Sequence, residues 1–172
     1  GFWQCPLDVN SRKYTAYSTP KGHYQYCVCP QGIKTGPSYF NLCVSRAMRQ
    51  CKGFALNYFD DIVIFSKTIQ EHLKHIRLVM EALKEYGFKI SAEKSTWIAK
   101  EVPLLGFIIS GKEIKVNPGK INTIRDRPEP KNSKQVETVL GLFQFYSRFI
   151  PDFANYSKIL YNLVKKDVPW NW

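Results

Sequence analysis

The sequence predicts an α+β fold in which a small antiparallel sheet packs on helices and is followed by a purely helical part. Short apolar and aromatic runs, bounded by Gly and Pro, alternate with amphipathic helical patterns up to about residue 116. After Pro118 only helical patterns follow. The 172 residues are enough for one ordinary domain or two small lobes, and the hydrophobic fraction of 44% is typical of globular proteins.

The first part of the chain is expected to form two hairpins and one helix. The expected elements are, in chain order, a hairpin of residues 14–18 and 23–29, a loop at 30–37, a helix at 38–50, and a second hairpin within 54–65. The second hairpin has apolar, β-prone flanks on both sides of Asp60-Asp61. We therefore expect both carboxylates at its turn.

The remaining chain is expected to form a long helix, three short strands and three helices. These are a helix at 69–86 stopped by Gly87, strands at 95–99, 104–109 and 113–116, and helices at 118–126, 132–149 and 156–166. The change from strands to helices near residue 116 is the expected internal boundary.

The net charge of +11 is large for a chain of this length and extends over both parts. Residues 1–111 carry 14 basic and 8 acidic side chains, and residues 112–172 carry 11 and 6. Such a surface favours a polyanionic partner, above all nucleic acid, although charge also serves solubility alone. No apolar run reaches the length of a membrane span, so no membrane partner is expected. The five cysteines show no zinc-type spacing and indicate a reduced intracellular compartment.

The adjacent carboxylates of Asp60 and Asp61 call for a physical explanation. Successive side chains of a strand point to opposite faces, so two neighbouring Asp residues share a site only where the backbone turns. Two like charges this close repel by roughly several kcal/mol unless a positive charge lies beside them. Carboxylates are oxygen ligands that suit Mg²⁺. The alternative is an ordinary turn that uses Asp for its backbone geometry alone.

The stretch YFDD at 58–61 is similar to the Tyr-x-Asp-Asp box of reverse transcriptases. The likeness continues through GFWQCPLD at the start of the chain, PQG at 30–32, VPLLGFIISGKEIKVNPGKI at 102–121 and PKNSKQVETVLGLFQFYSRFIPDFANYSKIL at 130–160. The chain thus resembles, in collinear order, the reverse transcriptases of gypsy-like long-terminal-repeat retrotransposons and of retroviruses.

The resemblance implies a reverse-transcriptase palm at residues 1–116, without its fingers and first catalytic strand, followed by the helical thumb and the start of the connection region at 117–172. It also implies an RNA-directed DNA polymerase that extends a primer with deoxynucleotides. In this family two Mg²⁺ ions, for which Mn²⁺ substitutes, assist the attack of the primer 3′-hydroxyl on the α-phosphate. Asp60 would be the main metal ligand and Asp61 a supporting one.

The resemblance assigns the other site residues to two groups. Those expected at the incoming nucleotide are Phe2, Gln31, Gly32 and Tyr58, and those expected at the primer and template are Leu105, Gly106, Phe107, Lys120, Arg125 and Lys134. The aromatic ring of Phe2 would leave no room for a 2′-hydroxyl. Taken without the resemblance, Phe2 reads as a core aromatic, the Gln31-Gly32 segment as an ordinary loop, and each basic residue as a solvated side chain.

The chain departs from the family pattern at its start. A third catalytic carboxylate is expected a few residues before Gly1, so the isolated chain is expected to polymerise weakly or not at all. The alternative is a non-catalytic nucleic-acid-binding module, truncated or domesticated, with the same fold. His72 and His75 have the spacing of a metal pair on the long helix, but a surface or packing role is favoured.

The resemblance further implies an RNA or DNA template with its primer, and deoxynucleoside triphosphates, as partners. Association with a second copy, or with other parts of a polyprotein, is a further expectation. The expected location is intracellular, in the cytoplasm, a virus-like particle or the nucleus.

Overall fold

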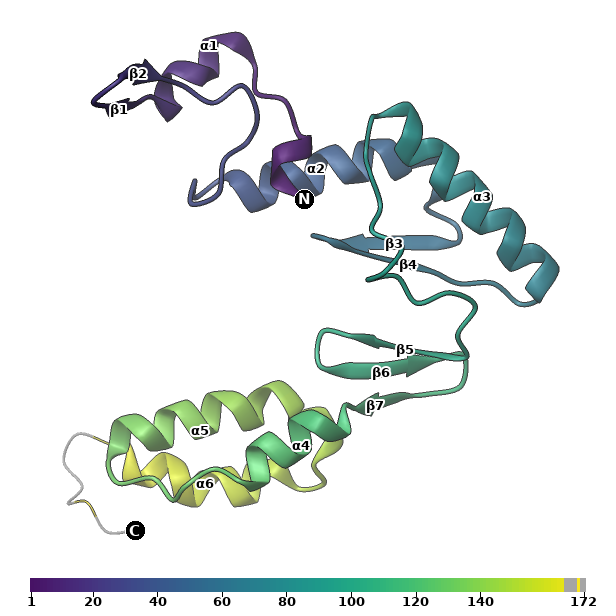
Figure 1. Cartoon of the computed structure of the whole chain (residues 1–172). Helices are drawn as coiled ribbons and strands as arrows, with labels where there is room; N and C mark the ends of the chain where they lie inside the picture. Colours follow the sequence, from purple (N-terminus) through teal and green to yellow (C-terminus); the bar gives the residue numbers. More distant parts are fainter. Residues whose placement is uncertain (166–169, 171–172) are drawn as a thin grey trace. The chain divides into compact units, whose positions relative to one another are not determined.

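The computed structural model describes residues 1–165 and 170, and the chain forms two compact units, Gly1–Ala99 and Lys100–Trp172. Each unit combines helices with antiparallel strands (Figure 1), which confirms the α+β fold class. The expected end of the last helix at residue 166 lies outside the described residues.

The first unit contains two hairpins, two long helices and several short helical turns. Its elements are η1 (Phe2–Gln4), α1 (Val9–Arg12), η2 (Lys13–Thr15), β1 (Tyr17–Thr19), β2 (Gly22–Tyr24), α2 (Gly36–Ala47), η3 (Met48–Cys51), β3 (Ala55–Tyr58), β4 (Asp61–Ile64) and α3 (Ile69–Glu85). Both expected hairpins and both expected helices are present. The first hairpin is shorter than expected, because residues 13–15 form a helical turn instead of extending the strand.

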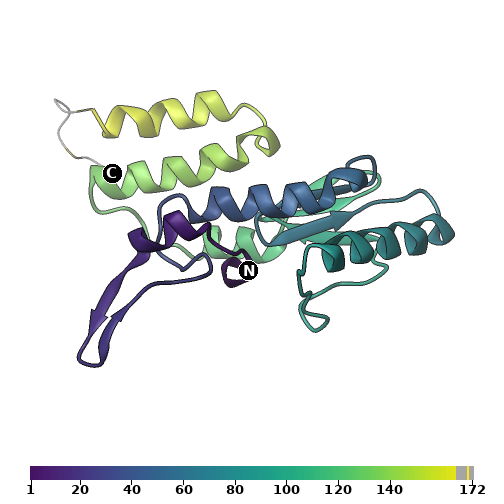
Figure 2. The same ribbon diagram turned by 90° about the horizontal axis from the view of Figure 1, so that it is seen from above.

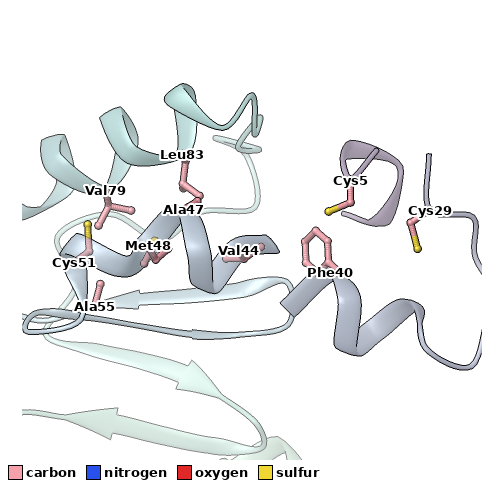
Figure 3. Close-up of a cluster of buried hydrophobic side chains, with 10 residues drawn as sticks. All are labelled: Cys5, Cys29, Phe40, Val44, Ala47, Met48, Cys51, Ala55, Val79 and Leu83. Carbon is pink, nitrogen blue, oxygen red and sulfur yellow. The ribbon is translucent and has the colours of Figure 1, made fainter. Parts of the chain in front are cut away.

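The core of this unit lies between α2, α3 and the β3–β4 hairpin. Phe40, Val44 and Ala47 on α2 follow helical spacing and are buried together with Val79 and Leu83 of α3 (Figure 3). The same buried cluster continues toward the hairpin through Met48, Cys51 and Ala55. Figures 1 and 2 show both helices on the same face of the hairpin.

The second unit is a three-stranded meander followed by helices. Its elements are β5 (Glu101–Leu104), β6 (Phe107–Ser110), β7 (Ile114–Val116), α4 (Pro118–Arg125), α5 (Ser133–Tyr146), η4 (Ser147–Phe149) and α6 (Phe153–Leu163). The order of the sheet is β5-β6-β7, with antiparallel pairing throughout. The three expected helices are present within a few residues, and the side chain of Asn132 caps α5 by accepting from the backbone N–H of Gln135.

Two strand predictions in this region were wrong. Residues 95–99 form no strand, and Ile98 has a φ of 51°, which is incompatible with extended pairing. The expected strand at 104–109 is divided by a turn at Leu105-Gly106, whose φ values are 51° and 85°. The apolar side chain of Leu105 concealed this turn in the sequence pattern.

The change from strands to helices falls between Val116 and Pro118, as expected. However, β5, β6 and β7 belong to the same compact unit as the helices that follow them. The division into a palm at 1–116 and a thumb at 117–172 stays a prediction. Within the described part of the chain, no helix is long and apolar enough to cross a membrane.

Candidate active site

The β3–β4 hairpin carries the paired carboxylates at its tip. Tyr58 pairs with Asp61, so Phe59 and Asp60 form the two-residue connection between the strands. Asp60 therefore lies in the turn and Asp61 is the first residue of β4. Both side chains are exposed, and their convergence on one cation stays a prediction.

The turn holds Phe59 in an unusual backbone conformation. Its φ is 48°, in the left-handed region that costs a non-glycine residue about 1 kcal/mol or more. Two-residue hairpin connections need positive φ at their first central position, because only then does the turn match the twist of the strands. The ring of Phe59 packs edge-on against Tyr58, with 4.8 Å between the ring centroids. The tip is thus a tight, strained turn flanked by two aromatic rings.

Within the described part of the chain, neither carboxylate forms an ion pair with a cationic side chain. Among residues 1–165 and 170, ion pairs join Lys115 to Glu113 and His75 to Glu71, and none involves Asp60 or Asp61. Exposed, unpaired carboxylate oxygens fit a divalent cation that takes its other ligands from water and phosphate. The described residues contain no group of three or more His, Cys, Asp or Glu side chains that could hold a metal ion.

The start of the chain lies against the hairpin tip. A methyl group on Gly1 would collide with the carboxylate of Asp60 and approach Phe40 Cζ to 2.9 Å. The next residue, Phe2, is half-buried and packs edge-on against Phe40, with ring centroids 5.3 Å apart. Figures 1 and 2 both place the N-terminus beside this end of the hairpin. The fold therefore brings Phe2 close to the carboxylates, and its ring also belongs to the edge of the core.

Gln31 and Gly32 lie in the exposed loop that leads into α2. Gly32 has a φ of 91°, so the loop uses the backbone freedom of glycine at this position. No contact within the described residues joins either of them to Asp60 or Asp61. Their expected nucleotide role stays a prediction.

The residues expected at the primer lie in the second unit. Leu105 and Gly106 form the turn between β5 and β6, and Phe107 begins β6. The ring of Phe107 contacts an aromatic cluster formed by Phe145, Tyr146 and Phe149, with centroid distances of 5.2, 5.7 and 5.5 Å. Lys120 and Arg125 on α4 and Lys134 on α5 are exposed. Their contacts with nucleic acid stay predictions.

His72 and His75 take part in packing and hydrogen bonding. Ser66 Oγ lies 3.1 Å from His72 Nδ1 and 2.7 Å from His75 Nδ1. The ring of His75 also stacks on Phe54, with centroids 3.9 Å apart. This agrees with the packing role favoured by the sequence. A shallow hollow further along α3 contains none of the predicted site residues and is lined by Leu73, Ile76, Arg77, Met80, Glu81 and Lys84.

The buried thiols near the start of the chain are chemically quiet. Burial, together with a hydrogen bond to Cys43, raises the pKa of Cys5 to about 12. Burial likewise raises the pKa of Cys29. Since the thiolate is the nucleophile, these cysteines stay protonated and serve as core residues.

A polar network beneath the hairpin was not predicted from the sequence. Asn57 Nδ2 donates to Asn41 Oδ1 at 2.8 Å and to Ser45 Oγ at 3.0 Å, and Ser45 Oγ lies 3.3 Å from Asn57 Oδ1. Asn57 is the inward-facing polar residue of an otherwise apolar strand face. That departure from the alternation of β3 was the available signal.

Comparison with protein families identifies the first two thirds of the chain. Residues 1–109 match the family described as reverse transcriptase (RNA-dependent DNA polymerase). The chain is 36% identical over 96% of its length to the retrovirus-related Pol polyprotein from transposon 297 of Drosophila melanogaster, and covers 16% of that polyprotein. It is 34% identical over its full length to the enzymatic polyprotein of cauliflower mosaic virus (strain NY8153), of which it covers 25%. The chain thus spans a quarter or less of these relatives.

Solved structures show the same relationship. The foamy viral protease-reverse transcriptase in complex with double-stranded DNA matches 99% of this chain with a TM-score of 0.89 and 30% identity, over 30% of its own length. The complex of the foamy viral enzyme with an RNA/DNA hybrid matches 99% of the chain with a TM-score of 0.83 and 29% identity, over 24% of its own length. With the paired carboxylates at the hairpin tip and the collinear sequence match, the chain belongs to the reverse transcriptase (RNA-dependent DNA polymerase) family.

Proposed function

We propose that this chain is the palm and thumb portion of an RNA-directed DNA polymerase that extends a primer with deoxynucleotides. The observation that carries the proposal is the exposed Asp60-Asp61 pair at a tight hairpin tip, free of cationic partners among the described residues. Family membership and the foamy viral complexes with nucleic acid support it. The net charge of +11 is also suited to a polyanionic partner.

The proposed division of labour follows from the geometry of the tip. Asp60 and Asp61 would hold the divalent cations, Mg²⁺ or Mn²⁺, with Asp60 as the main ligand. Bound cations would activate the primer 3′-hydroxyl and stabilise the leaving oxygen. Phe2 packs against Phe40, and the neighbouring Gly1 lies beside both Phe40 and the carboxylate of Asp60. In this position the ring of Phe2 would exclude a 2′-hydroxyl from the nucleotide site. Gln31, Gly32 and Tyr58 would complete the nucleotide contacts.

We also propose that the 172-residue chain by itself polymerises weakly or not at all. Two carboxylates hold a metal pair poorly, and the described residues offer no third acidic, histidine or cysteine ligand beside them. Template, primer and deoxynucleoside triphosphates are the proposed partners, together with a second copy or other parts of a polyprotein. The free cysteines accord with the proposed intracellular setting.

Primer extension tests the polymerase. The chain would be extended upstream of Gly1 with the corresponding segment of a related reverse transcriptase and supplied with an oligo-dT primer on a poly-A template. Asp60→Asn should lower the extension rate about hundredfold or more, because the carboxylate that would hold the activating cation is lost. Asp61→Asn should lower it less.

Binding to the same primer–template separates polymerase from binding module. If the extended protein does not extend the primer but binds it with steep salt dependence, the non-catalytic module is the better description. Equal extension by wild type and Asp60→Asn would refute the proposed catalytic role of the pair.

A further inference from the structure

Strand β3 has one inward and one outward face, and Asn57 lies on the inward one. Ala55 is buried and Asn57 is half-buried, whereas Leu56 and Tyr58 are 62% and 49% exposed. The neighbouring strand follows the same rule, since Ile62 and Ile64 of β4 pack against the core. Asn57 pairs with Ile62, one step from the pair of Tyr58 with Asp61. It is therefore the inward residue of β3 nearest to the carboxylate turn.

The amide of Asn57 is fully engaged by two residues of α2. Its two N–H groups donate to Asn41 Oδ1 at 2.8 Å and to Ser45 Oγ at 3.0 Å. The Ser45 hydroxyl returns a bond to Asn57 Oδ1 at 3.3 Å. Asn41 and Ser45 are four residues apart on α2, so they lie on one face of the helix and together clamp one side chain.

An apolar side chain at position 57 would pack against α2 as asparagine does. It would fix the position of β3 along α2 less strictly. Apolar contacts are non-directional, so a strand can slide along a helix with little cost. Hydrogen bonds of fixed length and direction oppose such sliding. Asn57, Asn41 and Ser45 are each half-buried and hydrogen-bond to one another, and within the described residues no buried side-chain nitrogen or oxygen lacks a partner.

We propose that Asn57 is a positioning residue that fixes the height of the Asp60-Asp61 turn over α2 and thereby sets the geometry in which both carboxylates meet a divalent cation. The inference rests on the proposed function. Helix α2 also carries Phe40, which contacts Phe2 and lies beside Gly1 at the carboxylate of Asp60. The network therefore connects the hairpin that carries the carboxylates to the same helix that carries Phe40, the partner of Phe2.

The test compares loss of the network with its replacement by apolar contacts. Asn57→Leu leaves Asn41 and Ser45 without partners, whereas a triple variant, Asn57→Leu with Asn41→Leu and Ser45→Ala, removes all the polar groups together. Unpaired buried polar groups are costly, but replacing all partners by apolar groups is close to neutral. Thermal unfolding of the 172-residue chain reports the structural effect. Paramagnetic broadening of the Asp60 and Asp61 amide signals by Mn²⁺ reports the site.

The expected results separate positioning from stability. Asn57→Leu should lower the melting temperature and raise the Mn²⁺ concentration for half-maximal broadening by about tenfold. The triple variant should have a melting temperature close to that of the wild type but should keep the raised Mn²⁺ requirement. If Asn57→Leu does not fold, the triple variant alone is compared with the wild type. Leu56→Ala, the outward neighbour, should leave the Mn²⁺ requirement unchanged.

Three results would overturn the inference. Recovery of both readouts in the triple variant would leave Asn57 with a structural role only. An unchanged Mn²⁺ requirement in Asn57→Leu would have the same meaning. Absence of broadening at residues 60 and 61 in the wild type, or its persistence in Asp60→Asn, would overturn the proposed metal site itself and this inference with it.

Discussion

Single residues with positive φ mark both turns to which the sequence assigns a function. Phe59 at the carboxylate turn and Leu105 and Gly106 at the β5–β6 turn have φ values of 48°, 51° and 85°. Residues in such conformations persist only where the surrounding structure holds them. At Gly106 the neighbouring structure is close: a Cβ added there would lie 2.9 Å from the hydroxyl oxygen of buried Tyr146.

Gly106→Ala should therefore destabilise the second unit by roughly 1 to 3 kcal/mol, through both its φ and its contact with Tyr146. Gly111→Ala is the matched control, since Gly111 also lies in a turn of this sheet and a Cβ added there would meet no atom within 4 Å. Urea unfolding of both variants measures the difference. Equal stability of the two variants would contradict this account of Gly106.

At the scale of the element, α3 begins with a capping arrangement that is readable in the sequence. Thr68 Oγ1 accepts from the backbone N–H of Glu71 at 3.2 Å, and Glu71 Oε2 accepts from the N–H of Lys67 at 2.8 Å. The pKa of Glu71 lies below its ordinary value, chiefly because its carboxylate accepts the hydrogen bond from the N–H of Lys67. Interactions with His75 and with the N–H of Thr68 lower it further. Thr68→Ala should lower the free energy of unfolding by about 1 kcal/mol in urea titrations.

The lowered pKa of Glu71 makes this cap dependent on pH. A carboxyl with a depressed folded-state pKa stabilises the protein above its unfolded pKa and loses that contribution as pH falls through the folded pKa. Wild type should therefore melt above Glu71→Gln at pH 7, and the gap should narrow as pH falls below the ordinary pKa of glutamate and close once pH is below the depressed folded-state pKa. Melting curves from pH 7 into the acid range measure the gap. A gap that is independent of pH would contradict the assignment.

Elements with strong local signals were predictable, and elements defined by distant contacts were not. The periodic apolar positions of α3, with Gly87 (φ 76°) as its stop, predicted that helix nearly to the residue. The β3–β4 hairpin followed from its apolar flanks. The false strand at 95–99 looked apolar but lacks a pairing partner in the described structure. The contact of Gly1 with Asp60 joins residues far apart in sequence, so no local pattern could predict it.

At the scale of the whole molecule, both units are basic. The first carries 13 basic and 7 acidic side chains and the second carries 12 and 7. Within the described residues, Lys115 is the lysine joined to a carboxylate by a salt bridge. The excess of positive charge in each unit suits a polyanionic partner.

Binding of primer–template should consequently weaken steeply with added salt. If Lys120 contacts a phosphate, as the resemblance implies, Lys120→Ala should lower the slope of log affinity against log salt by about one and weaken the binding of all sequences alike. Lys115→Ala is a suitable control, because its charge is already paired with Glu113 at 2.8 Å. Fluorescence anisotropy at several salt concentrations measures both slopes. An unchanged slope in Lys120→Ala would remove that residue from the nucleic-acid surface.

The two-residue connection between Tyr58 and Asp61 also determines which mutations this segment tolerates. Inserting or deleting a single codon there would shift the pairing of β4 by one place, and every side chain of that strand would change sides. Asp61 would then turn toward the apolar interior while Ile62 turned toward water. The segment should accept exchanges of side chains far more readily than any change in length.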